Sequence, residues 1–298
     1  MALTLHQLKI FTAVVEYGGI TAAAYKLHMT QPAVSIQVKQ LENHYGLPLL
    51  EVIGKKIHFT EAGQKLYKAS QEITACLNAL EMEFSQMQGC LKGRLSIAVV
   101  TTAKYFMPHL LGEFHRQHPH IEISLKVTNR EEVLERLQNN CDDLVIMSQL
   151  PEKVLIVAEK FLEDELVIPA PPDHLFAKKR HILLKELCNE PFISRESGSG
   201  TQMVMERLFN KHRLNPRIVM ELGSSSAIKQ AVIAGFGLSV LSKMSLEQEL
   251  KLNKLVILDI KGFPVRHHWY VVHLKKKILS PVANNFLQLL RDKKCPSK

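Results

Sequence analysis

The sequence lacks several features that would assign it to a simple class. Its five cysteines are odd in number and contain no C-x-x-C pair, which argues against a disulfide framework and for a reducing compartment. No run of about twenty apolar residues is present, so we expect no membrane span. The N-terminus MALTLHQLKIF has no basic region and no cleavage site, so we expect no signal peptide. Together these absences predict a cytoplasmic protein.

Motifs of catalysis and metal binding are also scarce. SGSGT at residues 197–201 matches neither GxGxxG nor GxxxxGK[ST], and no G-x-S-x-G elbow is present. His115, His118 and His120 lie close together in HRQHPH, but no cysteine or carboxylate cluster accompanies them. The sequence therefore predicts no enzyme, no metal site and no cofactor.

Apolar and basic residues are abundant. A chain of 298 residues with 46% hydrophobic content can bury a substantial core and is long enough for two or more domains. Its net charge of +9 favours a polyanionic partner, although this charge would also suit a basic enzyme.

Residues 20–46 predict a short helix, a tight turn and a longer helix. Thr30 is placed to cap the longer helix, Pro32 suits its first turn, and Gly46 ends it. Apolar residues recur in the longer helix at steps of four, three and four: Val34, Val38, Leu41 and Tyr45. This arrangement is typical of a helix-turn-helix.

The opposite face of the longer helix carries side chains that suit DNA. Gln31 and Ser35 can hydrogen-bond bases or phosphates, Lys39 can neutralise a phosphate, and no carboxylate occurs before Glu42. The alternative is a plain three-helix core with a solvated face, since this pattern alone is degenerate. The predicted DNA-contacting residues are Thr30, Gln31, Pro32, Ser35, Ile36 and Lys39, with Lys55 and Lys56.

The two lysines lie in residues 48–60, which alternate turn and strand character like the wing of a winged helix. A solvated hairpin is the alternative.

From residue 61 onward a proline-free helix is predicted, with an apolar heptad seam that needs a partner helix. Packing on the chain's own domain is again an alternative. The predicted dimerisation residues are Leu66, Ile73, Leu77, Leu80, Phe84 and Met87.

Beyond the glycines at 89 and 93, segments typical of strands and helices alternate to the end of the chain. This repeated βαβ pattern predicts a mainly parallel sheet. Three loops rich in Ser and Thr each follow a strand and open a helix, so their N–H groups and hydroxyls should meet at the carboxyl edge of a sheet.

Helix N-termini of this kind attract anions, although Ser and Thr can also serve only as helix caps. Lys229 is a further candidate anion partner. The predicted effector-binding residues are Thr101, Thr102, Lys104, Thr128, Asn129, Arg130, Ser197, Ser199, Gly200, Thr201 and Ser225.

The motif AA-x-x-L-x-x-TQPAVS-x-Q-x-x-x-LE from Ala23, then G-x-P-L and FTEAG, resembles the DNA-binding domain of LysR-type transcriptional regulators. Ile36 and Val52 stand where many members carry Arg. The resemblance implies an all-α winged helix-turn-helix domain and a long linker helix that pairs two subunits. It also implies an α/β effector domain made of two periplasmic-binding-protein-like subdomains. The implied boundaries are 1–60, 61–89, 90–163 with 268–298, and 164–267.

Operator DNA and a small-molecule co-inducer are the partners that the resemblance implies, in a homodimer or homotetramer, with RNA polymerase left open. No other cofactor and no membrane partner are expected. TTAKYFMP, NREEVLERL and SSSAIKQAV look most similar to regulators of the RuBisCO (carbon-fixation) operon, which are associated with phosphorylated sugar and reduced-nucleotide signals. The rival hypothesis is an α/β small-molecule-binding protein or enzyme whose N-terminal helices serve only for dimerisation.

Overall fold

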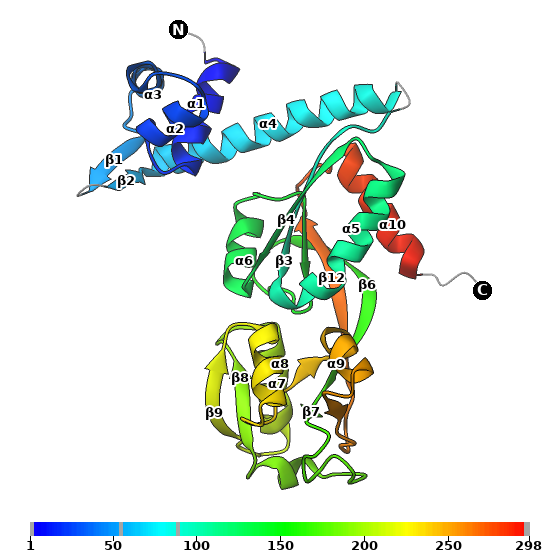
Figure 1. The fold of residues 1–298 in the computed structure, drawn as a ribbon. Helices are drawn as coiled ribbons and strands as arrows, with labels where there is room; N and C mark the ends of the chain where they lie inside the picture. Colours follow the sequence, from blue (N-terminus) through cyan, green and yellow to red (C-terminus); the bar gives the residue numbers. More distant parts are fainter. Residues whose placement is uncertain (1–2, 54–55, 88–89, 295–298) are drawn as a thin grey trace. The chain divides into compact units, whose positions relative to one another are not determined.

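The computed structural model describes residues 3–53, 56–87 and 90–294 (Figure 1). The chain divides into two compact units, 1–84 and 85–298. Among the described helices, none combines the length and the apolar content that a bilayer span needs.

Three helices form the core of the first unit: α1 (Leu5–Glu16), α2 (Ile20–Lys26) and α3 (Gln31–Tyr45). Thr4 begins α1 with a capping box, in which its hydroxyl accepts from the Gln7 N–H and the Gln7 side chain accepts from the Thr4 N–H. The small residues Ala23 and Ala24 of α2 are buried against the other two helices, which allows close packing. The helices therefore pack as a helix-turn-helix requires.

The longer helix α3 begins and ends where the sequence predicts. The Thr30 hydroxyl accepts from the Ala33 N–H at 3.4 Å, and Gly46 adopts the left-handed conformation at φ 66°. Val34, Val38 and Leu41 are buried. Tyr45, predicted on the same face, is 42% exposed, because the last residue of α3 lies beyond the core and its ring contacts only the edge of His44 among the described rings.

A hairpin and a long helix complete the first unit. Strand β1 (Leu50–Ile53) pairs antiparallel with β2 (Lys56–Phe59), and α4 (Glu61–Met87) follows. The start of α4 lies so close to the hairpin that a Cβ on Gly63 would be 2.0 Å from the Leu49 carbonyl oxygen. Only glycine fits there without a backbone shift.

The second unit is built on a six-stranded sheet in the order β10-β6-β12-β5-β3-β4. Its strands are β3 (Gly93–Val100), β4 (Ile121–Thr128), β5 (Leu144–Met147), β6 (Ile156–Val167), β10 (Leu241–Ser242) and β12 (Val265–Leu274). β3 runs parallel to β4 and β5, whereas β12 is antiparallel to β5 and β6, and β10 is antiparallel to β6. The prediction of a mainly parallel sheet is therefore wrong here, because β12 enters directly from the second core without the crossover that a parallel neighbour needs.

Helices cover both faces of the β3–β5 part of this sheet (Figure 1). On one face α5 (Met107–Gln117) and α10 (Pro281–Lys294) lie side by side, with the rings of Phe114 and Phe286 5.1 Å apart. On the other face α6 (Arg130–Gln138) buries Val133 and Leu137. Between β3 and α5 the chain forms a separate 3-10 turn, η1 (Thr101–Tyr105).

A second set of core clusters lies beyond the far ends of β6 and β12. β6 contributes Ala158 to the cluster under α6 and Leu166 to the second core, and β12 likewise contributes Val272 and Val265. The remaining elements surround the second core: β7 (Pro169–Ala170), η2 (Leu184–Leu187), β8 (Pro191–Arg195), α7 (Gly200–Lys211), β9 (Arg217–Leu222), α8 (Ser225–Ile233), η3 (Lys243–Leu246), α9 (Glu247–Lys251) and β11 (Val256–Ile257). β6 and β12 thus connect two separately packed cores.

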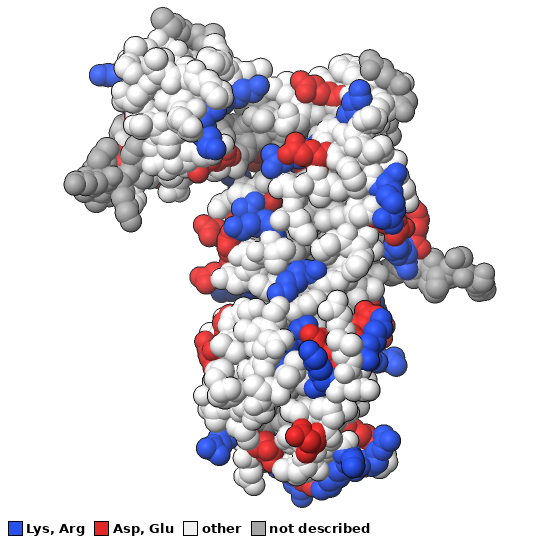
Figure 2. All heavy atoms as spheres, viewed as in Figure 1, with Lys and Arg blue, Asp and Glu red and all other residues white. Residues whose placement is uncertain are grey.

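Charged side chains of both signs are distributed over the second unit. Figure 2 shows Lys and Arg interspersed with Asp and Glu on its visible face. The excess of basic residues therefore forms no single continuous patch on that face.

Candidate functional site

The surface of α3 presents most of the residues predicted to contact DNA. Gln31, Pro32, Ile36 and Lys39 are exposed, and Ser35 is half-buried. The carboxylate of Glu42 accepts from the backbone N–H groups of Leu49 (2.9 Å) and Leu50 (3.4 Å), so it holds the start of the hairpin. The exposed face thus combines amide, hydroxyl and ammonium donors, the groups that read bases and neutralise phosphates.

The structure does not describe the side chains predicted to contact DNA from the wing. Lys55 lies outside the described residues, and so does the side chain of Lys56, whose backbone begins β2. Their contact with DNA stays a prediction.

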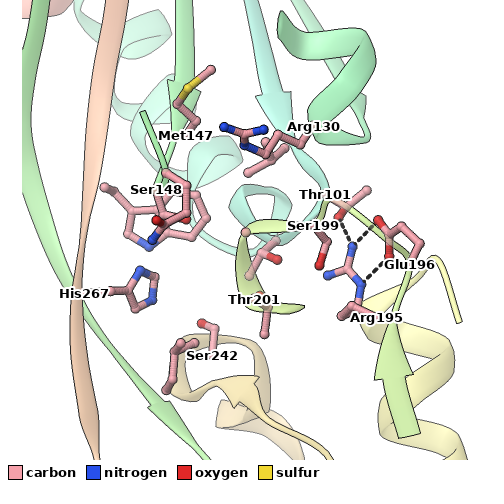
Figure 3. A pocket seen from close by; sticks show the side chains of 16 residues that line it. Thr101, Arg130, Met147, Ser148, Arg195, Glu196, Ser199, Thr201, Ser242 and His267 are labelled. Atoms are coloured by element: carbon pink, nitrogen blue, oxygen red, sulfur yellow. Dashed lines mark hydrogen bonds and ion pairs between the residues drawn. The ribbon is translucent and has the colours of Figure 1, made fainter. Parts of the chain in front are cut away.

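The second unit contains a narrow pocket between its two cores (Figure 3). Its walls come from the ends of β3 and β5, the first residues of α6 and α7, and the strands β8, β10 and β12. The cavity volume is about 20 Å³, roughly the space of one water molecule. The pocket is therefore nearly closed in this conformation, and we expect a larger ligand to need the two cores to move apart.

Six of the predicted effector-binding residues line this pocket: Thr101, Thr102, Arg130, Ser199, Gly200 and Thr201. They meet because the carboxyl end of β3 and the N-termini of α6 and α7 face the same space (Figure 3). The Ser199 hydroxyl also caps α7 by accepting from the Gln202 N–H at 3.1 Å. Helix capping and pocket lining are thus combined in one residue.

The other predicted residues are not in the pocket lining. The Thr128 hydroxyl donates to Glu132, and the Asn129 side chain caps α6 by accepting from the Glu132 N–H. Ser197 does not reach the pocket, and Ser225 is buried outside its lining. Lys104 donates to the Ser226 hydroxyl at 2.8 Å.

Lys229 does not fit its predicted role as an anion partner. Its ammonium group is buried, 2.7 Å from a Glu249 carboxylate oxygen, and it donates to the Ser245 carbonyl at 2.8 Å. It therefore stabilises the packing of α8 on η3 and α9.

Two guanidinium groups at the pocket differ in their partners. Arg195 is only 4% exposed and makes two hydrogen bonds of 2.7 Å to the Glu196 carboxylate. It also donates to the hydroxyls of Thr101 (2.9 Å) and Ser225 (3.0 Å), and Figure 3 shows the bonds to Thr101 and Glu196 as dashed lines. Its charge is therefore neutralised within the protein.

Arg130 has no such carboxylate among the residues that the structure describes. It is half-buried, its Nε is buried without a hydrogen-bond partner among the described residues, and burial lowers the pKa of its guanidinium. A buried cationic donor without an anion is costly in free energy. Arg130 is thus the group at this pocket that an anion would stabilise most.

Asp164 organises the opposite wall. Its buried carboxylate accepts from the Ser242 hydroxyl (2.6 Å), His267 Nε2 (3.1 Å) and Trp269 Nε1 (3.3 Å). Burial by itself raises the pKa of Asp164, but the hydrogen bonds from His267 and Ser242 outweigh it, and the pKa is lowered. The carboxylate thus fixes the His267 ring in the pocket wall.

Arg195, Asp164, His267 and Trp269 were not predicted as site residues. Each lies in a strand-like segment whose pattern does not distinguish a buried polar residue from a surface one. Among the residues that the structure describes, no three His, Cys, Asp or Glu side chains gather as metal ligands.

Comparison with known proteins covers both units. The family described as "Bacterial regulatory helix-turn-helix protein, lysR family" matches residues 5–85, and "LysR substrate binding domain" matches residues 88–294. The chain is 48% identical over 287 residues to the HTH-type transcriptional activator CmpR of Synechocystis, covering 96% of this chain and 94% of that protein. It is 43% identical over 290 residues to the RuBisCO operon transcriptional regulator of Allochromatium vinosum, covering 97% and 96%.

Solved structures show the same similarity. The regulatory domain of Synechocystis CcmR in complex with 2-PG is 47% identical, with a TM-score of 0.67, and the match covers 69% of this chain and 99% of that one. Full-length CbnR in complex with its target DNA has a TM-score of 0.68 and covers 98% and 100%. At 24% identity, CbnR supports the fold alone.

Proposed function

The chain belongs to the LysR family of bacterial transcriptional regulators, and from this premise we propose that an anionic metabolite, bound at Arg130 between the two cores, controls its action on DNA. It is a DNA-binding regulator and not an enzyme, because its relatives are named transcriptional regulators across nearly the whole chain. The rival hypothesis, that the N-terminal helices only dimerise, fails because residues 5–85 match the helix-turn-helix family.

The proposed effector is 2-phosphoglycolate or a close analogue. CcmR, 47% identical over this region, is described in complex with 2-PG, a small molecule with a phosphate and a carboxylate. Such an anion would take its hydrogen bonds from the Arg130 guanidinium and the hydroxyls of Thr102 and Thr201. Since several relatives are RuBisCO operon regulators, we propose genes of carbon fixation as the targets.

The single observation that carries the effector proposal is the pocket-lining guanidinium of Arg130, which has no carboxylate partner among the described residues. We would titrate the full-length protein with 2-phosphoglycolate by calorimetry and compare Arg130→Gln and Thr102→Val. Each variant should lose a charge-assisted hydrogen bond, worth about 1.5–3 kcal/mol, so Kd should rise roughly 10- to 100-fold.

Lys251→Gln is the control, because Lys251 is exposed and pairs with Glu247 away from the pocket. If the parent binds no 2-phosphoglycolate while a neutral compound raises its melting temperature, the anionic effector is the wrong class. Family membership and DNA binding would be unaffected by that result.

The organisation proposed for the whole protein follows the sequence. We assign residues 1–60 to DNA binding, 61–89 to dimerisation, and 90–163 with 268–298 and 164–267 to two effector subdomains. The strands β6 and β12 connect two cores near those boundaries, which supports this division. We place the protein in the cytoplasm, where operator DNA lies, and RNA polymerase stays a proposed partner.

A further inference from the structure

A second, larger pocket lies in the same unit, and we propose that it binds an organic anion in which a phosphate or similar group is joined to an apolar portion. Its volume is about 470 Å³, within the range of about 300–1,000 Å³ that small-molecule sites usually have. It is formed by one face of α7, the start of β12 and residues 148–150. Unlike the closed pocket at Arg130, it has room for a ligand without movement of the two cores.

The charge of its lining has one sign. Arg207, Lys211 and Arg266 line it, and none of the described residues that line it is a carboxylate. Arg207 and Lys211 are one turn apart on α7, so they share a face, and neither has an ion pair among the described residues. Like charges at this spacing destabilise a helix slightly, and a bound anion would remove that cost.

The remaining cation is only weakly neutralised. Arg266 Nε lies 3.6 Å from a Glu163 carboxylate oxygen, but both side chains are largely exposed. Exposed pairs of this kind contribute little free energy. The positive potential of the pocket is therefore largely intact.

His268 adds a hydrogen-bond donor beside the pocket. The Lys160 ammonium group lies 2.8 Å from His268 Nε2, and since an ammonium can only donate, Nε2 accepts. The ring proton then sits on Nδ1, which is buried and has no partner among the described residues. The His268 ring is therefore neutral, and the positive charge of the lining comes from Arg207, Lys211 and Arg266.

The other wall is apolar, so the part of the ligand that carries no charge should be apolar too. Leu150, Val204, Leu208, Val265 and the ring of Tyr270 line it. An apolar or aromatic portion of a ligand would bury surface there, while its anionic group lies against Arg207 and Lys211.

This site is separate from the proposed effector site. The two pockets share only Ser148, Gln149 and His267, and neither Arg130 nor Thr102 lines the second one. The proposal for this site therefore rests on other charged residues than the function proposed for Arg130.

The test compares phenyl phosphate with inorganic phosphate at constant ionic strength, by calorimetric titration of the full-length protein. Both probes carry a phosphate group, so their difference isolates the apolar wall, and phenyl phosphate should bind more tightly. In Arg207→Gln/Lys211→Gln its Kd should rise about tenfold or more. Both residues are exposed, so folding should be retained and is checked by melting.

Two controls keep the result specific. Arg116→Gln/Lys153→Gln removes the same charge from exposed positions outside the pocket, and Thr102→Val alters only the first pocket. Both should bind phenyl phosphate as the parent does. The proposal is overturned if the parent binds neither probe at millimolar concentration or binds both equally. It is also overturned if Arg207→Gln/Lys211→Gln binds normally, or if either control loses binding to the same extent.

Discussion

At the scale of single residues, partners decide which charges of the second unit are available to a ligand. Arg195 and Arg130 both line the closed pocket, yet the Glu196 carboxylate neutralises one and none neutralises the other among the described residues. The sequence predicted Arg130 because it directly follows a strand and opens a helix. It did not reveal Arg195, whose contacts to Thr101 and Ser225 join residues far apart in the chain.

Two residues of α3 should have separable effects on DNA binding. Lys39→Ala should weaken binding to all sequences and reduce the salt dependence by about one unit of slope, since one phosphate contact is lost. Gln31→Ala should change the sequence preference at a cost of about 1–3 kcal/mol. Both effects can be measured by fluorescence anisotropy over a series of salt concentrations. The probe is the intergenic DNA beside the gene that encodes this protein. Unchanged binding by both variants at matched salt would contradict the assignment.

Asp164 should make the stability depend on pH in the acid range. Because its pKa in the fold is lowered from the usual 3.8, its contribution is fully present above the unfolded pKa. That contribution is lost as the pH falls through the lower folded pKa. The free energy of unfolding, measured with urea from pH 7 downward, should therefore fall less steeply in Asp164→Asn than in the parent.

At neutral pH, Asp164→Asn should already be less stable by about 1–3 kcal/mol, since the hydrogen bonds to the carboxylate are disturbed. Asp173→Asn, at an exposed position, is the matched control. If the free energy of unfolding falls equally steeply with pH in the parent and in Asp164→Asn, this carboxylate is not the source of the pH dependence.

At the scale of elements, the helices were more predictable than the sheet. Local signals define a helix, and Thr30 and Gly46 indeed bound α3 as predicted. The sheet depends on which distant strands meet. The residues of β12 predict a strand, but nothing in them indicates that it runs antiparallel between β5 and β6.

The long helix α4 carries an exposed apolar seam. Ile73, Leu77, Leu80, Phe84 and Met87 are between 36% and 80% exposed. Leu66, predicted with them, is already buried in the core of the first unit with Phe11 and Leu41. The part of the seam from Ile73 onward is thus the part available to a second chain.

Leu80→Asp should dissociate the dimer, because a charge in an apolar interface loses hydration without gaining a partner. Sedimentation at low protein concentration measures the loss. Ala75→Asp adds the same charge at an exposed position of α4 away from the seam and should leave the dimer intact. A fully dimeric Leu80→Asp protein would show that the seam packs elsewhere.

At the scale of the whole second unit, hydrogen bonds cross between its two cores. Lys104 and Tyr105 of η1 both bond the Ser226 hydroxyl of α8, at 2.8 and 3.1 Å, and Arg195 of β8 bonds Thr101. Since only about 20 Å³ is open at Arg130, we expect a ligand to enter when these contacts separate.

Ser226→Ala should therefore accelerate both association and dissociation of 2-phosphoglycolate, and Kd should change less than either rate. The expected factor is roughly 2- to 10-fold, the effect of a hydrogen bond worth about 0.5–1.5 kcal/mol. Stopped-flow fluorescence of the buried Trp269 measures it. Ser224→Ala is the control, since Ser224 makes no side-chain capping bond. Rates equal to those of the parent would show that these contacts do not limit entry.

Pairing of two chains through the exposed seam of α4, as we propose, would make the stability of the protein depend on its concentration. A face of five apolar side chains that a second chain covers contributes its free energy only when two chains meet. Each tenfold dilution then lowers the stability of the dimer by about 1.4 kcal/mol, and its melting temperature falls with it. Under the proposed pairing, the melting temperature of the purified protein should therefore rise with its concentration.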